Sequence, residues 1–417
     1  MPRPAALVLT PRFPWPLDDG GRIVLWQSVW SAARTHDVTL ISFVPPAEVS
    51  APVAEPVAAV CARIVRVAHR PPPLPVAAWR GAVGRWPFTL ARYQDPAFAR
   101  AVREAVARDR PEYVLANHLH LAPYVEDLSG VPMVLREHNA EHRWMERQAR
   151  DRGPSAAGLY ARLQAKRLRM AERRLCERAA LVLAIQEGEA AALRAIAPEA
   201  RVRTLPVGVD LGRFLEPSPT RPPVVLLPGS FAWAPNAEGA LRFLEEGWPR
   251  IRAEAPEARL RLAGKAPPAA LRAAASRAGD RVVVAADVPS MEEEYSRATV
   301  VVVPLWVGAG ARVKIVEAMA ARAPVAATSL AAEGLDLEPE LQYACADEPR
   351  DLADAVIRLL RDPAERIRLG AQGRALAEAR WSLESTARRQ AALIGEVVGR
   401  PGSSRPERAA GEAALRT

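Results

Sequence analysis

Short apolar runs alternate with helical patterns along almost the whole chain, and this alternation limits the folds that the chain can adopt. The first half contains six such runs, at residues 5–10, 38–43, 64–67, 113–116, 133–135 and 181–185. The second half repeats the arrangement with runs at residues 224–227, 259–263, 282–285, 299–303 and 325–328. Buried strands separated by helices are typical of a parallel sheet covered on both faces. The sequence therefore predicts two doubly wound, Rossmann-like α/β domains that face each other across a cleft.

The expected domain boundaries follow from changes in this pattern. We expect an N-terminal domain over residues 1–205, a proline-rich hinge over 206–223, a C-terminal domain over 224–396 and a disordered tail over 397–417. The tail prediction rests on a composition rich in glycine, serine, arginine and proline. Expected helices of the second half cover residues 237–254, 266–278, 291–297, 311–322 and 350–361, and residues 363–396 also have a helical pattern.

Length and composition agree with a protein of two domains that has no membrane span. The chain has 417 residues, of which 49% are hydrophobic, and this is enough for two separate cores. No apolar run approaches the roughly 20 residues that span a bilayer, and residues 5–10 lack the flanks of a signal peptide. The three cysteines are scattered, without the spacing of a metal or redox site. We therefore expect a cytoplasmic protein with reduced cysteines.

Lysine is rare in this chain, and two of its lysines follow glycines. Among 57 basic residues only Lys166, Lys265 and Lys314 are lysines. Lys265 follows Gly264, and Lys314 follows a glycine-containing loop where an expected strand gives way to an expected helix. A compact ammonium group beside free helix N–H groups suits a diphosphate. Glu317 is three residues further on and shares the helix face of Lys314, so its carboxylate can accept hydrogen bonds from ribose hydroxyls.

Several motifs, in fitting order and spacing, resemble glycosyltransferase family 4, the group 1 glycosyltransferases. In the second half the matching segments are residues 227–230, 233–236, 260–264, 302–305, 314–320, 323–325 and 333–335. In the first half they are residues 19–22, 137–141 and 206–210. The resemblance covers roughly residues 5–395 and implies the GT-B fold, in which the last helix crosses back to the first domain.

The resemblance also implies a reaction. A hexose-type sugar moves from a nucleoside diphosphate donor to an acceptor held by the N-terminal domain, with retention of anomeric configuration. No metal and no cofactor other than this co-substrate is expected. Lys314, together with Lys265 or Arg312 and the helix N-terminus, is expected to stabilise the departing diphosphate. The full set of expected donor-binding residues is Gly20, Gly21, Gly229, Asn236, Lys265, Gly310, Arg312, Lys314 and Glu317.

Histidines mark the expected N-terminal side of the cleft. Four of the six come just after two consecutive expected strands. His118 and His120 follow the first of these strands, and His138 and His142 follow the second. The resemblance implies that a histidine at about the position of His120 approaches the transferred sugar, and His118 remains an alternative. We expect His120, His138 and Lys314 to be the catalytic residues.

Two departures leave other functions open. Ala309 stands where the family usually has the first of two glutamates eight positions apart, so a protein that binds nucleotide sugar without turnover is one alternative. The segment from His138 to His142 also matches the H-x-x-E-H zinc pattern of a metallopeptidase. That pattern needs both histidines on one helix face, whereas here it directly follows an expected strand.

The net positive charge of the chain lies in its first half. Residues 1–205 hold 29 basic and 20 acidic residues, while the second half is balanced. Residues 61–110 alone hold ten arginines and three acidic residues, with Trp79 and Trp86 among them. Basic residues with aromatic neighbours suit an anionic membrane surface, and they equally suit a solvated face. We expect a glycan or lipid-linked acceptor, peripheral association with the inner face of the membrane, and no nucleic acid partner.

Overall fold

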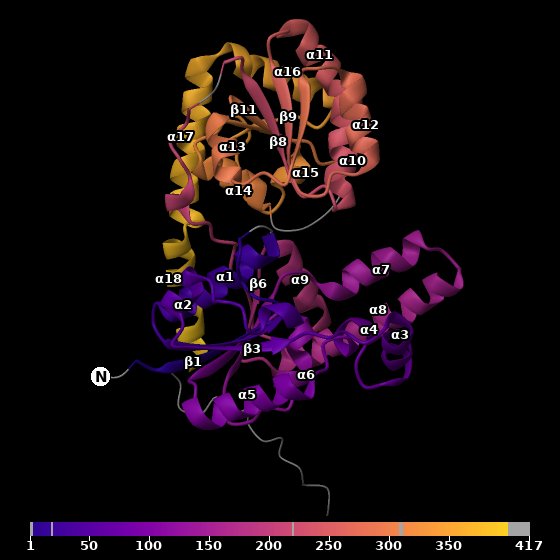
Figure 1. Cartoon of the computed structure of the whole chain (residues 1–417), viewed down its shortest axis with the longest axis vertical. Helices are drawn as coiled ribbons and strands as arrows, with labels where there is room; N and C mark the ends of the chain where they lie inside the picture. The colour runs from indigo at the N-terminus through magenta and orange to yellow at the C-terminus, as the bar shows by residue number, and fades with distance from the viewer. Residues whose placement is uncertain (1–2, 18–19, 219–220, 308–311, 399–417) are drawn as a thin grey trace, which may run out of the picture.

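The computed structural model describes residues 3–17, 20–218, 221–307 and 312–398, which form two α/β domains stacked along the long axis of the molecule (Figure 1). Every strand pair in both sheets is parallel, and helices cover the sheets. The strand orders are β3-β2-β1-β4-β5-β6-β7 and β10-β9-β8-β11-β12-β13. In each sheet the strand order reverses at the first strand of the domain. This strand is β1, beside β4, in the N-terminal sheet and β8, beside β11, in the C-terminal sheet. The predicted fold class, two facing Rossmann-like domains, is confirmed.

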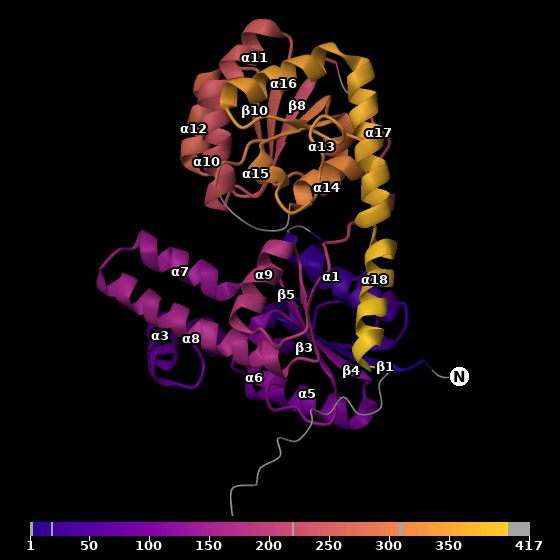
Figure 2. The same ribbon diagram turned by 180° about the vertical axis from the view of Figure 1, so that it is seen from behind.

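The N-terminal sheet consists of β1 (Ala5–Thr10), β2 (Asp37–Val44), β3 (Arg63–Ala68), β4 (Tyr113–Asn117), β5 (Met133–Glu137), β6 (Leu181–Ala184) and β7 (Val202–Thr204). Its helices are α1 (Gly20–Ala33), α2 (Glu55–Val60), α3 (Leu74–Val83), α4 (Phe88–Ala91), α5 (Pro96–Asp109), α6 (Ala122–Val125), α7 (Glu141–Asp151), α8 (Ala156–Arg178) and α9 (Glu187–Ile196). In both views α7 and α8 project sideways from this domain as a helical hairpin (Figures 1 and 2).

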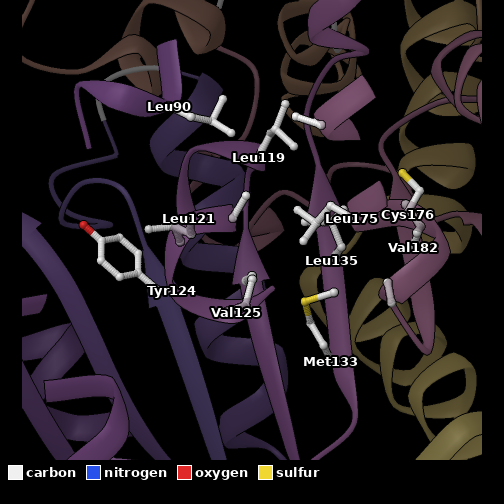
Figure 3. Close-up of a cluster of buried hydrophobic side chains, with 14 of the residues drawn as sticks. Leu90, Leu119, Leu121, Tyr124, Val125, Met133, Leu135, Leu175, Cys176 and Val182 are labelled. Atoms are coloured by element: carbon white, nitrogen blue, oxygen red, sulfur yellow. The ribbon is translucent and has the colours of Figure 1, made fainter. Parts of the chain in front are cut away.

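Alternating side chains of the strands supply two separate cores. Along β1, Leu7 and Leu9 belong to the core on one face of the sheet, while Ala6 and Val8 belong to the core on the other. Figure 3 shows part of the first core, where Met133 and Leu135 of β5 lie beside Leu175 of α8 and Val182 of β6. Burying a side chain of this size contributes about 1.5–3 kcal/mol. The cores hold the strand ends, and the loops that follow them, in fixed positions.

The C-terminal sheet consists of β8 (Val224–Pro228), β9 (Arg259–Gly264), β10 (Val282–Ala286), β11 (Val300–Val303), β12 (Val325–Ala327) and β13 (Ala344–Cys345). Its helices are α10 (Ala234–Arg242), α11 (Trp248–Glu254), α12 (Ala269–Ala278), α13 (Met291–Arg297), α14 (Val313–Ala320), α15 (Ser329–Ala332), α16 (Pro349–Arg361) and α17 (Pro363–Arg380). A five-residue π-helix, Phe243–Gly247, joins α10 to α11. The last helix, α18 (Leu383–Val398), follows α17 after a break at Trp381 and Ser382.

The chain crosses between the domains twice, and the two crossings lie side by side. Val209 on the first crossing forms a parallel bridge with Ser382 on the second. The Val209 N–H donates to the Trp381 carbonyl over 2.7 Å, and the Leu383 N–H donates to the Val209 carbonyl over 3.0 Å. Beyond the crossing, α18 packs against α1, and its Ile394 and Val397 enter the N-terminal core. The two domains are therefore connected by a short, hydrogen-bonded double crossing.

The sequence-predicted elements differ from the observed ones mainly at short strands and helix ends. Two short edge strands, β7 and β13, were not predicted, because two or three residues carry too little apolar pattern. The helical pattern predicted over residues 363–396 is formed by two helices, α17 and α18, which are separated at Trp381 and Ser382. None of the helices in the described residues has the length and apolar character that crossing a bilayer requires. Most of the predicted tail and part of the loop before α14, including Gly310 and Ala309, lie outside the described residues.

Candidate active site

A cavity of about 640 Å³ lies between the two domains. The N-terminal domain contributes the segment that follows β1 and the start of α1, including Gly20 and Gly21. The C-terminal domain contributes the loops after β8, β9 and β10 and the first turn of α14. The cavity thus adjoins the carboxyl ends of β1 and β8, next to which each sheet reverses its strand order. Ligands of doubly wound α/β domains bind at such positions.

Lys314, Asn236 and Gly229 meet at one end of this cavity. The Lys314 ammonium group donates to Asn236 Oδ1 over 2.6 Å, and the Asn236 amide donates to the Ser230 carbonyl over 2.9 Å. A Cβ atom at Gly229 would lie 3.3 Å from Lys314 Nζ. Burial lowers the pKa of Lys314 to about 8, and the nearby Arg312 acts in the same direction. The cavity therefore contains a desolvated cation. No carboxylate of the described residues lies within hydrogen-bonding distance of this ammonium group.

Glu317 lies on the same helix and, like Lys314, is partly buried. The Tyr295 hydroxyl of α13 donates to Glu317 Oε2 over 3.0 Å. Burial raises the pKa of Glu317 to about 7, although the hydrogen bond from Tyr295 opposes this shift. A carboxylate that faces a cavity in this way can accept hydrogen bonds from vicinal hydroxyl groups of a ligand.

Arg312 precedes α14 and adds a second cation to this part of the cavity. Its guanidinium group is buried and donates to Glu333 Oε2 over 3.4 Å, while its Nε has no hydrogen-bond partner among the described residues. As the N-cap residue of α14, Arg312 makes no side-chain hydrogen bond to the first N–H groups of the helix. The N-terminus of α14 therefore borders the cavity without a side-chain cap, and the positive end of a helix favours an anion. Lys265, after β9, also lines the cavity.

The two domains approach each other closely at Gly20. A Cβ atom added at Gly20 would lie 3.8 Å from Val313 Cγ2, at the start of α14. The N-terminal glycines therefore face the same part of the cavity as Lys314. Arg213 and Glu292 form an ion pair on the C-terminal side of the cavity.

The histidines expected at the cleft form a cluster of their own, outside the lining of this cavity. The ring centroids of His118 and His120 lie 4.1 Å apart, and those of His118 and His138 lie 5.1 Å apart. Tyr93 extends the cluster, with its ring centroid 4.5 Å from that of His120. Burial lowers the pKa values of His120 and His138 well below the ordinary value, so both rings are neutral.

Each of these histidines has a buried ring nitrogen without a partner in the described part of the chain. The atoms are His118 Nδ1, His120 Nδ1 and His138 Nε2. The other ring nitrogen of His118, Nε2, lies 3.3 Å from Glu141 Oε1. The His118 backbone has a φ of 83°, which is strained for a residue with a side chain. Unsatisfied buried nitrogens and local strain are both common where a ligand binds.

Two carboxylates hold the loop that carries His138. Glu172 of α8 accepts hydrogen bonds from the Glu141 and His142 N–H groups, over 2.7 and 3.1 Å, and His142 Nδ1 lies 2.5 Å from the same carboxylate. Glu189 of α9 accepts from the Ala140 N–H over 2.6 Å. His138 precedes α7, so it does not share a helix with His142. The H-x-x-E-H zinc geometry is therefore not formed, because a helix begins only at the fourth position of the motif.

Two comparisons by sequence identify the family. Residues 20–213 match the model of glycosyltransferase family 4, and residues 222–362 match that of the glycosyl transferases group 1. The two matches cover most of both domains. They include every described residue that lines the cavity except Trp15, Pro16, Leu17, Phe214 and Leu383. The chain belongs to the group 1 glycosyltransferases of family 4. No curated protein matches this glycosyltransferase by sequence.

Solved structures share the fold of this glycosyltransferase over nearly its whole length. Sucrose-phosphate synthase from Thermosynechococcus elongatus is 21% identical, with 95% of this chain and 99% of that chain covered and a TM-score of 0.70. HepE from Anabaena, in complex with UDP and glucose, is 15% identical, with 94% and 99% covered and a TM-score of 0.66. WaaG, which is involved in lipopolysaccharide biosynthesis, is 16% identical, with 94% and 99% covered and a TM-score of 0.64.

Some residues of the glycosyltransferase site could not be found by sequence reasoning. Tyr295 reaches Glu317 from a helix predicted at residues 291–297, yet a tyrosine in an amphipathic helix carries no sign of a site. Glu172 and Glu189 are acidic residues on long helices, where solvent exposure is the usual expectation. Their role in holding the loop of His138 becomes visible only when three elements are placed together.

Proposed function

We propose that this glycosyltransferase moves a hexose-type sugar from a nucleoside diphosphate donor in the 640 Å³ cavity to an acceptor held by the N-terminal domain. The observation that carries the proposal is that Lys314 and Glu317, both partly buried, share one helix face in the cavity beside Gly20 of the other domain. Nucleotide-sugar transfer agrees with the family, and HepE, which shares the fold, has been solved with UDP-glucose.

The donor half of the reaction needs positive charge where the diphosphate leaves. The bond between the anomeric carbon and the β-phosphate oxygen breaks, and negative charge grows on that oxygen. Lys314, with Arg312 or Lys265, and the free N–H groups of α14 would stabilise this charge. Glu317 would hold the ribose, and Asn236 would release Lys314 to the phosphate. Gly20, Gly21 and Gly229 leave room for the donor at the domain boundary.

The acceptor half is assigned to the histidine cluster. A sugar or acceptor hydroxyl can donate to the free ring nitrogens of neutral His120 and His138. In the structure these rings do not line the donor cavity, so bringing them to the anomeric carbon requires the domains to move about their double crossing. We propose His120, His138 and Lys314 as the catalytic residues, with His118 paired to Glu141 as the support of the cluster.

The stereochemistry and the metal requirement are also part of the proposal. We propose retention of anomeric configuration and no metal requirement, as the family resemblance implies. The acceptor is proposed to be a glycan or a lipid-linked precursor of the cell envelope, because WaaG shares the fold and takes part in lipopolysaccharide biosynthesis. The proposed site of action is the cytoplasmic face of the membrane.

A nucleotide panel tests the donor assignment. UDP, GDP, ADP and dTDP should be compared by thermal shift, and the corresponding nucleotide sugars should then be tested for donor hydrolysis. We expect one nucleotide to raise the melting temperature and its sugar conjugate to be turned over. Lys314→Ala should lower donor turnover about 10²- to 10³-fold, whereas Lys166→Ala, the same change at an exposed position of α8, should leave it unchanged. Nucleotide binding without any turnover of donor would favour a binding protein instead.

A further inference from the structure

The helices α3, α7 and α8 carry an unusual share of the exposed apolar side chains, and we refer to these three helices as the helical arm. Among the described residues, fourteen large apolar side chains are exposed, and eight of them lie on the arm. They are Leu74, Val76, Trp79, Val83, Trp144, Leu159, Leu163 and Met170. Trp79 is 67% exposed and Leu159 is 57% exposed. In both views the arm stands out from the sheet (Figures 1 and 2).

The apolar residues of α8 form a stripe with basic residues beside it. Leu159, Leu163 and Met170 are separated by four and seven positions and therefore share one helix face. The opposite face, with Ala161, Ala165 and Leu168, is buried. The exposed basic residues Arg162, Lys166 and Arg169 follow the stripe along the helix. The exposed side of α8 is thus both apolar and basic.

A second apolar stripe lies beside the first, because α3 is fixed to α8. Gln164 of α8 donates to the Gly81 carbonyl over 3.0 Å, and the Tyr160 hydroxyl donates to the Ala78 carbonyl over 2.8 Å. Tyr160 and Gln164 are the immediate neighbours of Leu159 and Leu163. On α3, Val76, Trp79 and Val83 again share one helix face and stay exposed. The α3 helix therefore widens the apolar surface instead of covering it.

The charge of the arm favours an anionic partner. The α8 helix holds seven basic residues and two acidic ones. Arg80, Arg162 and Lys166 make no ion pair with the residues that the structure describes. Exposed tryptophan and aliphatic side chains flanked by free lysine and arginine are typical of surfaces that lie at the headgroup level of a bilayer. Protein interfaces, in contrast, are depleted of lysine.

The arginines of residues 61–110 do not by themselves define this surface. They are divided between β3, α3 and its flanks, and α5, and α5 lies apart from α3 in both views (Figures 1 and 2). Exposed apolar side chains, rather than the count of arginines, single out the α3 side of the domain.

The arm is also connected to the proposed acceptor site. The α7 helix begins at Glu141, whose carboxylate lies 3.3 Å from His118 in the histidine cluster. Glu172, in the middle of α8, holds the same loop by its hydrogen bonds to Glu141 and His142. A surface docked through α3 and α8 therefore lies on the element that positions the cluster.

We propose that the helical arm docks this glycosyltransferase on an anionic phospholipid bilayer, with Trp79 and the Leu159, Leu163 and Met170 stripe in the headgroup layer and Arg80, Arg162 and Lys166 against lipid phosphates. The further statement that the acceptor is lipid-linked rests on the proposed function. The docking itself does not, since it follows from the exposed side chains of the arm.

Vesicle co-sedimentation at low and high salt tests the docking on the full chain. We expect binding to phosphatidylglycerol vesicles, weaker binding at high salt, and little binding to phosphatidylcholine. The double variant Trp79→Ser, Leu163→Ser should bind about ten-fold more weakly, and Arg162→Gln, Lys166→Gln should lose most of the salt dependence. The control is Val283→Ser, Ile367→Ser, which changes two exposed apolar residues of the other domain and should leave binding unchanged.

Nucleotide affinity of the same variants separates this proposal from the proposed function. Unchanged nucleotide affinity with lost vesicle binding is the expected result and also shows that the variants fold. Equal vesicle binding by wild type and the Trp79, Leu163 variant would overturn the docking, as would no binding at low salt. Concentration-dependent self-association that the same variant abolishes, without vesicle binding, would instead identify a protein interface. A wild-type chain that docks yet binds no nucleotide would overturn the proposed function alone.

Discussion

The Lys314 ammonium group donates a hydrogen bond to Asn236 Oδ1 across 2.6 Å, and this contact joins the first turns of α14 and α10. An amide oxygen satisfies one of three ammonium donors and leaves the charge uncompensated. The position is desolvated, and burial lowers the pKa of Lys314 to about 8. A diphosphate that replaces Asn236 as the partner of Lys314 would supply the missing negative charge. This contact therefore indicates that the Lys314 ammonium group can bind an anionic ligand.

Removal of this cation should impair turnover far more than folding. Lys314→Ala should lower turnover about 10²- to 10³-fold, because loss of one group that stabilises developing charge has that effect. Its melting temperature should equal or exceed that of wild type, because a charge that is buried at a cost in the folded state has been removed. Steady-state kinetics and calorimetric melting measure the two effects. Near-normal transfer by Lys314→Ala would remove Lys314 from the catalytic site.

Nucleotide affinity should depend on pH with two limbs. Burial raises the pKa of Glu317 to about 7, so its carboxylate becomes a full acceptor for ribose hydroxyls only above that pH. Burial lowers the pKa of Lys314 to about 8, so its positive charge is lost above that pH. Affinity should therefore fall below about pH 7 and above about pH 8. Isothermal titration calorimetry across this range would give the profile.

Single substitutions should remove one limb each. Glu317→Gln should lose the acidic limb and Lys314→Met the alkaline limb. Glu292→Gln, at another carboxylate that lines the cavity, should keep both limbs but move the acidic limb to lower pH, because the charge of Glu292 helps to raise the pKa of Glu317. A profile in Glu317→Gln identical to that of wild type would contradict the ribose role of Glu317.

The sequence largely predicted which expected donor-binding residues come together at one cavity, because most of them are close to one another in the chain. Lys314 and Glu317 belong to one helix, so their spacing alone places them on one face. Gly229 and Asn236 follow one strand within a single βα unit, and parallel strands bring such units to one edge of the sheet. The fold class was predictable for the same reason, since the alternation of strands and helices repeats in both domains.

The histidine cluster, which we propose as the acceptor site, could be predicted less fully from the sequence, because it depends on contacts between distant elements. The sequence placed His118, His120 and His138 at strand ends, but it could not show that they form a cluster outside the donor cavity. Nor does any periodicity show that Glu172 faces His142. The sequence pointed to Trp79 and Arg80 of α3, but not to the stripe on α8, because the exposed apolar residues of α8 follow the same helical spacing as core residues.

Chelation should leave the enzyme active. The His138 and His142 pair does not form the helical zinc pattern, and no group of three candidate ligand side chains is close enough to hold a metal within the described residues. Purified protein should therefore contain no stoichiometric zinc by elemental analysis, and activity should survive treatment with a chelator. One zinc per chain that disappears in His142→Ala would support the metallopeptidase alternative.

Glu172 should contribute to stability as well as to the shape of the acceptor site. Its carboxylate accepts from two backbone N–H groups and contacts His142, and its side chain is fully buried. Glu172→Ala leaves these donors unsatisfied, which costs about 1–3 kcal/mol for each buried group. Urea unfolding should show a loss of this size. The control is Glu177→Ala on the same helix, whose exposed pair with Arg173 contributes only about 0.3–0.5 kcal/mol. Similar losses in both variants would contradict the positioning role of Glu172.

The end of β9 should tolerate no side chain at Gly264. Its φ is +148°, and a Cβ atom there would lie 1.8 Å from the Gly229 carbonyl oxygen, which no rotamer can relieve. Gly264→Ala must therefore push β9 away from the loop after β8, where Gly229 adjoins Lys314 and Asn236. We expect lower stability together with weakened nucleotide binding, measured by thermal melting and calorimetry.

Gly279→Ala provides the matched comparison, because it separates backbone strain from steric overlap. Gly279 also has a positive φ, of +107°, but the nearest atom to an added Cβ is the flexible Arg252 guanidinium, at 3.6 Å. This variant should lose about 1–3 kcal/mol from backbone strain alone. Its nucleotide affinity should stay at the wild-type value, since Gly279 precedes β10 and so lies at the end of the sheet opposite the loops that line the cavity. Equal loss of nucleotide affinity in both variants would mean that general destabilisation, and not the contact between Gly264 and Gly229, governs the donor site.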